Sequence, residues 1–399
     1  MKVLVLASLY APMTGGAETY IRLLAEGLAA QGHKVAVITD GSRLPGEQAR
    51  ETLGGVELIR LSDFASELDR EDKVRWRRMQ YAVLEEIADR LPWVPDLLHV
   101  NSHETLVLGS MIALEYDVPL VASLHEQKPD LLAFGRGRCK LAYSTLPVDA
   151  YLAGSAFYHR RAVAFGAPED RLTLIYHGVE LPDLSPRARE RGRRRFGVAE
   201  GVPLVVCAAR LDPRKGQDDL VQAFARVREQ VPEARLLLAG RVADFPYAQR
   251  VRALIESRGL AGAVDVIEDL TDVDMPDVMA AADVVAQPSL EEGLGLAAIE
   301  AMSWSRPVVA CDVVGLEEIF THEVDGLLTP AQDPERLSEA LVRLLLDPGL
   351  AARLGAAARQ TVIKRFSQAA MVRETLRVYE TARARRRAPV VTPEGRTLP

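Results

Sequence analysis

Short apolar runs alternate with amphipathic stretches along the whole chain. In the first half, the apolar runs of strand length are Lys2–Ala7, Lys34–Thr39, Leu97–Val100, Leu120–Leu124, Ala150–Ala153 and Leu172–Tyr176. In the second half they are Leu204–Ala208, Arg235–Ala239, Asp265–Ile267, Val284–Ala286 and Val308–Ala310. Stretches with helical spacing of apolar residues lie between or after these runs, among them Ala17–Gln31, Gln217–Gln230, Asp333–Leu346 and Leu350–Arg365. Strands that alternate with helices predict parallel, doubly wound sheets, so we expect an α/β fold.

The length and one change in composition predict two domains. A chain of 399 residues is long for a single core. The stretch Gly178–Arg195, with two prolines and then a run of arginines, marks the junction. We therefore expect an N-terminal domain over residues 1–180 and a C-terminal domain over residues 195–365. A helix is expected over residues 366–387, and the tail 388–399, with three prolines and no periodicity, is expected to be mobile.

The composition is that of an ordinary globular protein, with 48% hydrophobic and 26% charged residues. The net charge of −7 argues against general nucleic-acid binding, which usually needs a basic excess. The three cysteines are widely separated and lack the spacing of metal ligands, so we expect reduced thiols and a cytoplasmic location. No apolar run approaches the ~20 residues of a membrane span.

One segment has a composition suited to a membrane surface. Residues 69–90 carry several arginines together with Trp76, Met79, Tyr81 and Leu84, a pattern that can lie on an anionic bilayer. Acidic residues in the same segment nearly cancel its charge, which favours a solvated amphipathic helix instead. We therefore expect at most a weak peripheral contact with the inner face of the membrane.

The segment Pro288–Met302 holds the most informative chemistry in the chain. Glu292 and Glu300 flank a Gly-Leu-Gly turn that opens into an apolar helix. Backbone N–H groups and the positive end of the dipole at such a helix start suit a phosphate. Glu300, an acceptor-only carboxylate inside the helix, suits the hydroxyls of a ribose, and Glu292 would face whatever carries the phosphate. Glycines in such a turn can also serve only close helix–strand packing, but the two glutamates favour a nucleotide-sugar site.

Two basic residues follow the predicted strand Leu204–Ala208. Arg210 offers a planar fork to a diphosphate, and Lys215 offers a point charge just before a glycine. Both stand at the carboxyl end of a central strand, where open α/β sheets bind ligands. There they would stabilise a leaving nucleoside diphosphate as negative charge builds on it. The alternative is that both residues form surface ion pairs only.

Two further candidates lie in the first half of the chain. The turn Gly15–Gly16 after the first strand either lets the backbone approach a phosphate or only permits positive φ. It lacks the Gly-x-Gly-x-x-Gly spacing of a dinucleotide fold, which disfavours a nicotinamide enzyme. His125 ends the run Pro119–Leu124 and could donate to a sugar hydroxyl or a carbonyl, or could be hydrogen-bonded structure.

One pair of acids has the Asp-x-Asp spacing of a metal site. Asp272 and Asp274 precede the predicted helix Asp277–Ala282, whose exposed N–H groups aspartates commonly cap. We therefore expect no metal site and no cofactor.

Together these motifs resemble those of glycosyltransferase family 4, the retaining enzymes with the GT-B fold. That family carries Glu, seven intervening residues and Glu around a Gly-Phe-Gly or Gly-Leu-Gly turn, as Glu292 and Glu300 do here. It also has an Arg and then a Lys-Gly after the first strand of the C-terminal domain, matched by Arg210 and Lys215, and an early turn matched by Gly15–Gly16. The resemblance implies two facing Rossmann-like domains, with the last helix crossing back to the first domain. It implies metal-independent, retaining transfer of a sugar from a nucleoside diphosphate sugar to a hydroxyl acceptor.

The resemblance also assigns roles to residues. Glu300 would bind the ribose. The base would lie near the Glu268–Leu270 turn, whose backbone would recognise it. Glu292 and His125 would contact the donor sugar, while Arg210 and Lys215 would neutralise the diphosphate; these four form the expected catalytic set. The amides of the glycine turn would hold the diphosphate. Besides Arg210, Lys215, Glu292 and Glu300, the expected donor-binding residues are Gly15, Gly16, Glu268, Asp269, Leu270, Gly293, Leu294, Gly295 and Leu296.

Two segments depart from the family pattern. Tyr176–Glu180 has His177 where the family usually has Asn, and Val313–Glu318 keeps Gly315 but has Val314 where a second glycine is common. Two rival functions share the same fold: a sugar-nucleotide 2-epimerase, which needs no acceptor, and a non-catalytic carbohydrate- or nucleotide-binding relative. The intact basic and acidic motifs argue against the second rival.

Overall fold

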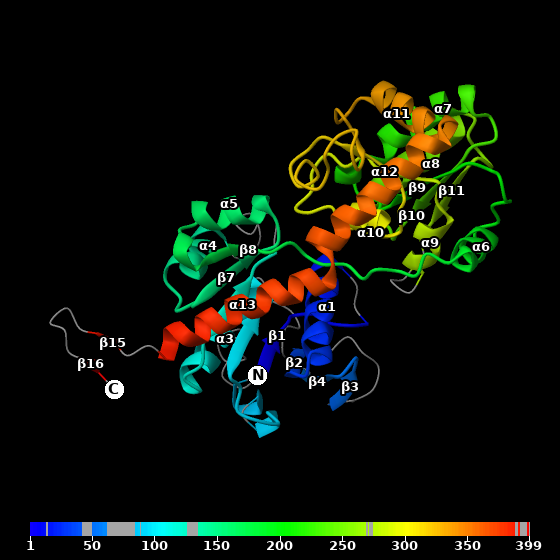
Figure 1. Ribbon diagram of the computed structural model, residues 1–399. Coiled ribbons are helices and arrows are strands. Elements are labelled where there is room, and N and C mark those ends of the chain that lie inside the picture. The colour runs from blue at the N-terminus through cyan, green and yellow to red at the C-terminus, as the bar shows by residue number, and fades with distance from the viewer. Residues whose placement is uncertain are drawn as a thin grey trace. The chain divides into compact units, whose positions relative to one another are not determined.

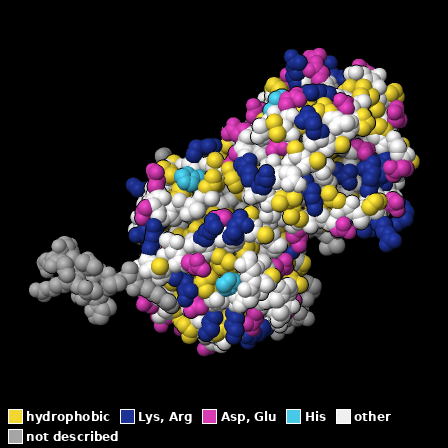
Figure 2. All heavy atoms as spheres, viewed as in Figure 1, with side chains coloured by type: hydrophobic (Ala, Val, Ile, Leu, Met, Phe, Trp, Pro, Cys, Tyr) yellow, Lys and Arg dark blue, Asp and Glu magenta, His cyan; other side chains and the backbone are white. Residues whose placement is uncertain are grey.

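The computed structural model describes residues 1–12, 15–41, 50–61, 84–87, 89–125, 135–268, 270, 274–387, 390–391 and 397–398. The chain forms two compact units, each built around one large sheet, and a small antiparallel pair of β15 (Val390–Val391) and β16 (Thr397–Leu398) follows the last helix (Figure 1). Unit 1 contains Met1–Gly178 and Gln368–Pro399, and unit 2 contains Val179–Ser367. On the face shown in Figure 2, basic and acidic side chains are interspersed over both units. None of the helices in the described part of the chain has the length and apolar content to cross a membrane.

Unit 1 has an eight-stranded sheet in the order β3-β4-β2-β1-β5-β6-β7-β8. All neighbours are parallel except β3 and β4, which form an antiparallel hairpin. The central strands are almost continuously apolar because helices cover both faces of a parallel sheet. The strands are β1 (Lys2–Leu6), β2 (Lys34–Asp40), β3 (Arg50–Leu53), β4 (Val56–Leu61), β5 (Leu97–Val100), β6 (Leu120–Ser123), β7 (Ala150–Ala153) and β8 (Leu172–Leu174).

The helices of unit 1 include the last helix of the chain. They are α1 (Gly16–Ala30), α3 (His103–Glu115), α4 (Gly135–Ser144), α5 (Ala156–Ala164) and α13 (Gln368–Arg387). The Gln368 side chain donates to the Leu23 carbonyl at 2.7 Å. A Cβ at Gly27 of α1 would lie only 2.6 Å from Val372, so the glycine lets α1 and α13 pack closely. The C-terminal helix therefore returns to the first unit, as the GT-B fold requires. Of the expected mobile tail, Ala388, Pro389, residues 392–396 and Pro399 lie outside the described residues.

Unit 2 has six parallel strands in the order β11-β10-β9-β12-β13-β14. They are β9 (Leu204–Ala208), β10 (Arg235–Ala239), β11 (Val264–Ile267), β12 (Val284–Gln287), β13 (Val308–Cys311) and β14 (Leu327–Thr329). Its helices are α6 (Pro186–Arg195), α7 (Gln217–Gln230), α8 (Phe245–Ser257), α9 (Met275–Ala281), α10 (Leu296–Ser303), α11 (Pro334–Leu346) and α12 (Pro348–Thr361), with a π-helical turn at Val362–Phe366. The chain builds outward from β9 on one side and from β12 on the other. The order reverses between these two strands, and ligands bind at such a point in open α/β sheets.

The arginine-rich stretch before residue 195 is a helix packed into unit 2. Arg193 of α6 is buried and donates to the Ala199 carbonyl at 2.6 Å and to Asp283 at 3.2 Å. Arg189 reaches the other oxygen of Asp283 at 2.6 Å. Unit 2 therefore begins at Val179, earlier than the expected residue 195, because these arginines serve as internal hydrogen-bond donors.

Candidate functional site

The loops that follow β9 and β12 meet at the point where the strand order of unit 2 reverses. After β9, Pro213–Lys215 forms a 3₁₀ turn, and Asp212 caps it by accepting from the Arg214 amide at 3.0 Å. The Leu290 amide donates to the Arg214 carbonyl at 2.8 Å and ties the two loops together.

A glycine makes this approach feasible. Gly216 has φ +64°, and a Cβ on it would lie 2.1 Å from the carbonyl oxygen of Pro288. Only a residue without a side chain fits both the left-handed conformation and the contact. The Lys-Gly spacing noted in the sequence therefore has a local cause: the glycine brings the lysine beside the loop after β12.

Lys215 and Glu292 form an ion pair in this position. Lys215 Nζ lies 2.6 Å from Glu292 Oε1, and the two side chains are only 17% and 7% exposed. A carboxylate this buried needs a positive partner or several hydrogen bonds. Two charges predicted from separate motifs are thus brought together, at a place suited to an anionic ligand.

The glycine turn after Glu292 leads straight into α10. No side chain caps this helix, so the positive end of its dipole faces the turn Gly293–Gly295. A Cβ at Gly295 would lie 2.3 Å from Leu316, and a Cβ at Gly315 would lie 2.6 Å from the Glu292 carbonyl. The loop at residues 313–318 therefore packs closely against the Gly293–Gly295 turn. Close approach is retained at Gly315, while Val314 is 41% exposed.

The other predicted donor residues of unit 2 flank this centre. Arg210 follows β9 with an exposed side chain, and its carbonyl accepts from Gln217 at 2.8 Å. Glu300 is half-buried on α10. Glu268 follows β11 and is paired with Arg252 of α8. Of its neighbours, Leu270 is half-buried, and Asp269 lies outside the described residues.

His125 lies in unit 1, just after β6, and is held by Asn101. The Asn101 amide nitrogen donates to the Ala17 carbonyl at 3.1 Å, which leaves its oxygen to accept from His125 Nε2 at 2.8 Å. Burial is the main cause that holds the pKa of His125 well below its usual value, and the nearby His177 adds to it. The imidazole is therefore neutral at pH 7, with its proton on Nε2.

A second buried histidine packs against the same group. His177 stacks on Tyr20 with ring centroids 4.3 Å apart and lies 4.8 Å from His125. Burial lowers the pKa of His177 to about 3. A Cβ at Gly154 would lie 2.1 Å from His177 Nε2, so this departure from the family pattern fills a space that the neighbouring glycine leaves open.

The turn before α1 does not use glycine for its conformational freedom. Gly15 has φ 170°, which is extended backbone open to any residue, and Gly16 is the first residue of α1. The Gly15 carbonyl accepts from the Thr19 amide at 2.9 Å. The reading of Gly15 as a positive-φ turn is therefore wrong, and backbone access to a ligand stays a prediction.

Of the two aspartates with metal-like spacing, only Asp274 lies within the described residues. Asp274 is the N-cap residue of α9, but its side chain makes no capping hydrogen bond; its carboxylate accepts instead from Arg195 of α6 at 2.5 Å. Asp272 lies outside the described residues. Within the described part of the chain, no group of three or more His, Cys, Asp or Glu side chains is arranged to hold a metal.

Two residues near Glu292 were not predicted. Gln287, the last residue of β12, and Ser289 are buried and donate to Glu292 Oε1 at 3.1 Å and 2.9 Å. Polar residues directly after the apolar run Val284–Ala286, at a carboxyl strand end, are the signal that would have pointed to them.

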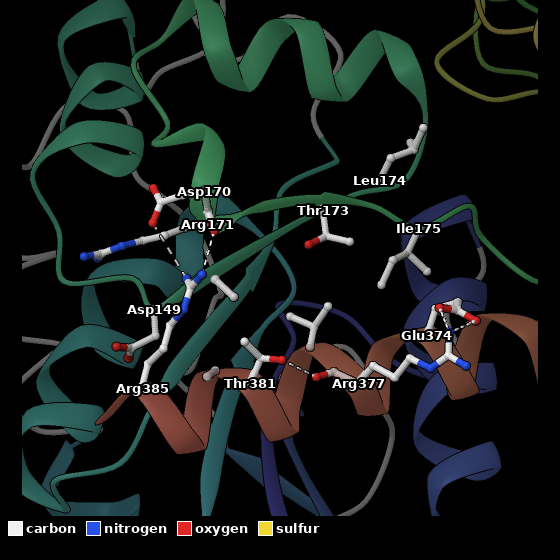
Figure 3. Close-up of a pocket in the computed structure, with 13 residues that line it drawn as sticks. Asp149, Asp170, Arg171, Thr173, Leu174, Ile175, Glu374, Arg377, Thr381 and Arg385 are labelled. Carbon is white, nitrogen blue, oxygen red and sulfur yellow. Dashed lines mark hydrogen bonds and ion pairs between the residues drawn. The ribbon is translucent and has the colours of Figure 1, made fainter. Parts of the chain in front are cut away.

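A separate groove of about 250 Å³ lies in unit 1 between β8 and α13 (Figure 3). Figure 3 shows Arg385 beside Asp170 and Arg377 beside Glu374 along this groove. Arg385 donates to the Asp170 carbonyl at 3.0 Å, and Arg377 pairs with Glu374 at 2.8 Å. None of the predicted site residues lines this groove.

Comparison with known proteins agrees with the fold and with the family resemblance. The profile of "Glycosyl transferases group 1" matches residues 188–361, and that of "Glycosyltransferase Family 4" matches residues 14–182. A D-inositol 3-phosphate glycosyltransferase of Xylanimonas cellulosilytica is 30% identical over 393 residues, covering 94% of this chain and 93% of that protein. A GDP-mannose-dependent phosphatidylinositol monomannoside mannosyltransferase of Mycobacterium tuberculosis is 34% identical over 238 residues, 56% of this chain and 60% of that protein.

Solved structures show the same architecture. The Anabaena protein HepE in complex with UDP-glucose superposes with a TM-score of 0.76 at 22% identity, over 96% of this chain and all of that one. Sucrose-phosphate synthase from Thermosynechococcus elongatus superposes with a TM-score of 0.77 at 24% identity. The match covers 96% of this chain and 100% of that one.

The chain belongs to the family 4, group 1 glycosyltransferases and has the GT-B fold. It is a retaining hexosyltransferase that moves a sugar from a nucleoside diphosphate sugar to a hydroxyl acceptor. The resemblance read from the motifs is confirmed.

Proposed function

We propose that unit 2 binds the donor at the reversal point between β9 and β12, without a metal ion. The buried pair of Lys215 and Glu292 beside the uncapped start of α10 carries this proposal. A lysine and a helix dipole neutralise a diphosphate in the way a divalent cation does elsewhere.

Each residue then has a part in the transfer. Lys215 and Arg210 stabilise the charge that builds on the leaving diphosphate, and the amides of the Gly293–Leu296 turn bind its oxygens. Glu300 accepts from the ribose hydroxyls, and Glu292 contacts the donor sugar. The base lies near Glu268 and Leu270. These are roles proposed from the motifs and the local geometry.

In the reaction, the bond from the anomeric carbon to the phosphate oxygen breaks as the acceptor hydroxyl attacks from the same face. The acceptor proton passes to the departing phosphate oxygen, so atoms and charge balance without an added base. No covalent intermediate on a carboxylate is needed, unlike in retaining glycosidases. Glu292, which accepts three hydrogen bonds on one oxygen, suits an orienting role better than a nucleophilic one.

His125, Gly15 and Gly16 stay predicted donor contacts from unit 1. The neutral imidazole of His125 commits its Nε2 proton to Asn101, so a hydroxyl that met the ring would donate to Nδ1.

We infer that the acceptor is a small or lipid-linked alcohol of the inositol type. Several relatives of similar length are D-inositol 3-phosphate glycosyltransferases, and another acts on a phosphatidylinositol mannoside. Three free, buried cysteines support a reducing, cytoplasmic compartment. A role in bacterial polysaccharide synthesis and a weak membrane contact stay predictions, and most of the segment 69–90 lies outside the described residues.

Thermal unfolding with UDP, GDP and ADP, each with EDTA, tests donor binding. A nucleotide at ~100 times its dissociation constant stabilises the folded state by about 2.7 kcal/mol. We expect one nucleotide to raise the midpoint in EDTA. The corresponding hexose donors are then incubated with and without inositol 3-phosphate. Product only with acceptor supports the transferase, and an epimer formed from donor alone supports the 2-epimerase. No shift with any nucleotide supports the binding relative.

A further inference from the structure

Glu292 is held through one of its two carboxylate oxygens. Oε1 accepts from Lys215 Nζ at 2.6 Å, from Ser289 Oγ at 2.9 Å and from Gln287 Nε2 at 3.1 Å. A carboxylate oxygen has two lone pairs, so three donors saturate it. None of these three donors reaches Oε2, and a further hydroxyl would therefore bind there.

The hydrogen positions in this cluster are fixed by the contacts. Gln287 Nε2 lies 2.9 Å from Ser289 Oγ and 3.1 Å from Glu292 Oε1, so its two hydrogens serve one acceptor each. The single hydroxyl proton of Ser289 is then free to point at Glu292. The reversed amide would place the Gln287 oxygen against the Glu292 carboxylate and is excluded by repulsion.

The Gln287 side chain adds little to the stability of the fold. Its Oε1 is buried and has no hydrogen-bond partner among the described residues. An unsatisfied buried acceptor costs free energy, and an apolar residue of the same size would avoid that cost. A side chain kept despite such a cost points to a role for its N–H groups rather than for packing.

Building on the proposed function, we propose that Gln287 and Ser289 are positioning residues. They hold Glu292 by Oε1 and leave Oε2 to accept a hydroxyl of the donor sugar. Lys215 has two anionic partners once the diphosphate is bound, Glu292 and the phosphate. Gln287 and Ser289 are neutral, so they keep the carboxylate in place while the lysine turns to the phosphate.

The test compares Gln287→Leu and Ser289→Ala with Ser338→Ala as a control. Ser338 is a buried serine of the same unit whose hydroxyl donates to the Glu335 carbonyl at 2.6 Å, within its own helix α11. We measure kcat and KM for the donor, the dissociation constant of the nucleoside diphosphate alone, and the unfolding midpoint without ligand. Ser289→Thr, which keeps the hydroxyl, tests rescue.

We expect both site variants to lower kcat by roughly 10- to 100-fold, the cost of a misplaced reacting group. KM and nucleotide affinity should change less than about threefold, since ribose and diphosphate contacts are intact. The Gln287→Leu midpoint should be unchanged or higher. Ser338→Ala should keep normal kcat, and Ser289→Thr should regain most of it.

Normal kcat in both site variants would overturn the proposal, as would a kcat loss that follows a fall in midpoint. Crystal structures of the wild-type protein and Gln287→Leu give a readout that needs no turnover. The proposal requires the Glu292 carboxylate to move in the variant, and an unmoved carboxylate rejects it. Failure of the proposed function looks different, because the wild-type protein would then transfer no sugar from any donor.

Discussion

The two units keep polar groups buried in opposite ways. Unit 1 contains six of the seven histidines, and burial lowers the pKa values of His99, His125 and His177. His99 contacts Tyr379 at 2.5 Å and Ser123 at 2.8 Å. Unit 2 buries a full charge pair, Lys215 with Glu292. A neutral network is insensitive to an anion but loses stability when acid protonates it. A charge pair is available to an anionic ligand but is damaged when either partner is removed.

The largest effect expected is on transfer. Lys215→Ala and Glu300→Ala should each fold but lose at least about 100-fold in kcat/KM, the size seen when a preorganised charge contact is removed. Lys364→Ala, which removes an exposed lysine of the same unit, is the control and should stay near wild type. Steady-state kinetics with the nucleotide sugar measures this. Near-normal activity of either site variant would contradict the proposal that these charged residues of unit 2 bind the donor.

The charge pair should also show in stability. Lys215→Met leaves Glu292 buried without its cation and should lower the free energy of unfolding by roughly 3 kcal/mol. In Lys215→Met/Glu292→Gln the neutral amide no longer needs a cation, so part of that loss should return. Urea denaturation of both variants and of Glu292→Gln completes the cycle. Strictly additive losses would mean that the two side chains do not depend on each other.

Acid should distinguish the units. Burial lowers the folded-state pKa values of His99 and His177 to about 3, against about 6.5 when unfolded. Because the unfolded chain binds more protons, stability is complete above about pH 6.5 and is lost as the pH falls toward 3. Each histidine should cost roughly 2 kcal/mol at pH 5.

Hydrogen exchange at pH 7 and pH 5 locates this loss. We expect protection to fall in unit 1 before unit 2, and His177→Asn to reduce the pH dependence by about one proton. Equal loss in both units would contradict the contrast between them.

The smallest effect is expected at a departure from the family pattern. Val314→Gly should change kcat/KM less than about twofold, because the side chain faces solvent and Gly315 provides the close contact with Glu292. A clear gain in activity would show that the valine restricts the phosphate site.

Much of the fold could be predicted from apolar runs. The expected strands Leu97–Val100, Ala150–Ala153, Leu204–Ala208 and Arg235–Ala239 coincide with β5, β7, β9 and β10. The edge strand β3 was not predicted because it is short, mostly exposed and without an apolar pattern, and β4 was not predicted because Glu57 and Arg60 interrupt its apolar run. The prolines and arginines of Gly178–Arg195 predict a junction between domains, whereas α6 belongs to unit 2, where Arg193 finds its acceptors.

The site was predictable in its components but not in its contacts. Glycine and charge spacing pointed to Lys215 and Glu292, yet nothing local shows that residues 77 positions apart form one pair. The role of Asp274 was mistaken for the same reason, because its partner Arg195 comes from another helix. The family resemblance assigned a function to each residue type, and only the tertiary fold shows which oxygen of Glu292 is occupied.

The return of α13 to unit 1 has a consequence for how the protein is made. Unit 2 is one continuous stretch of chain, whereas unit 1 lacks Tyr379, the partner of His99, until α13 has been synthesised after the whole of unit 2. The unit that is started first is therefore finished last. During synthesis the apolar strands of unit 1 stay uncovered on this face until α13 is made, so deleting α13 would destabilise unit 1 and not the neighbouring unit 2.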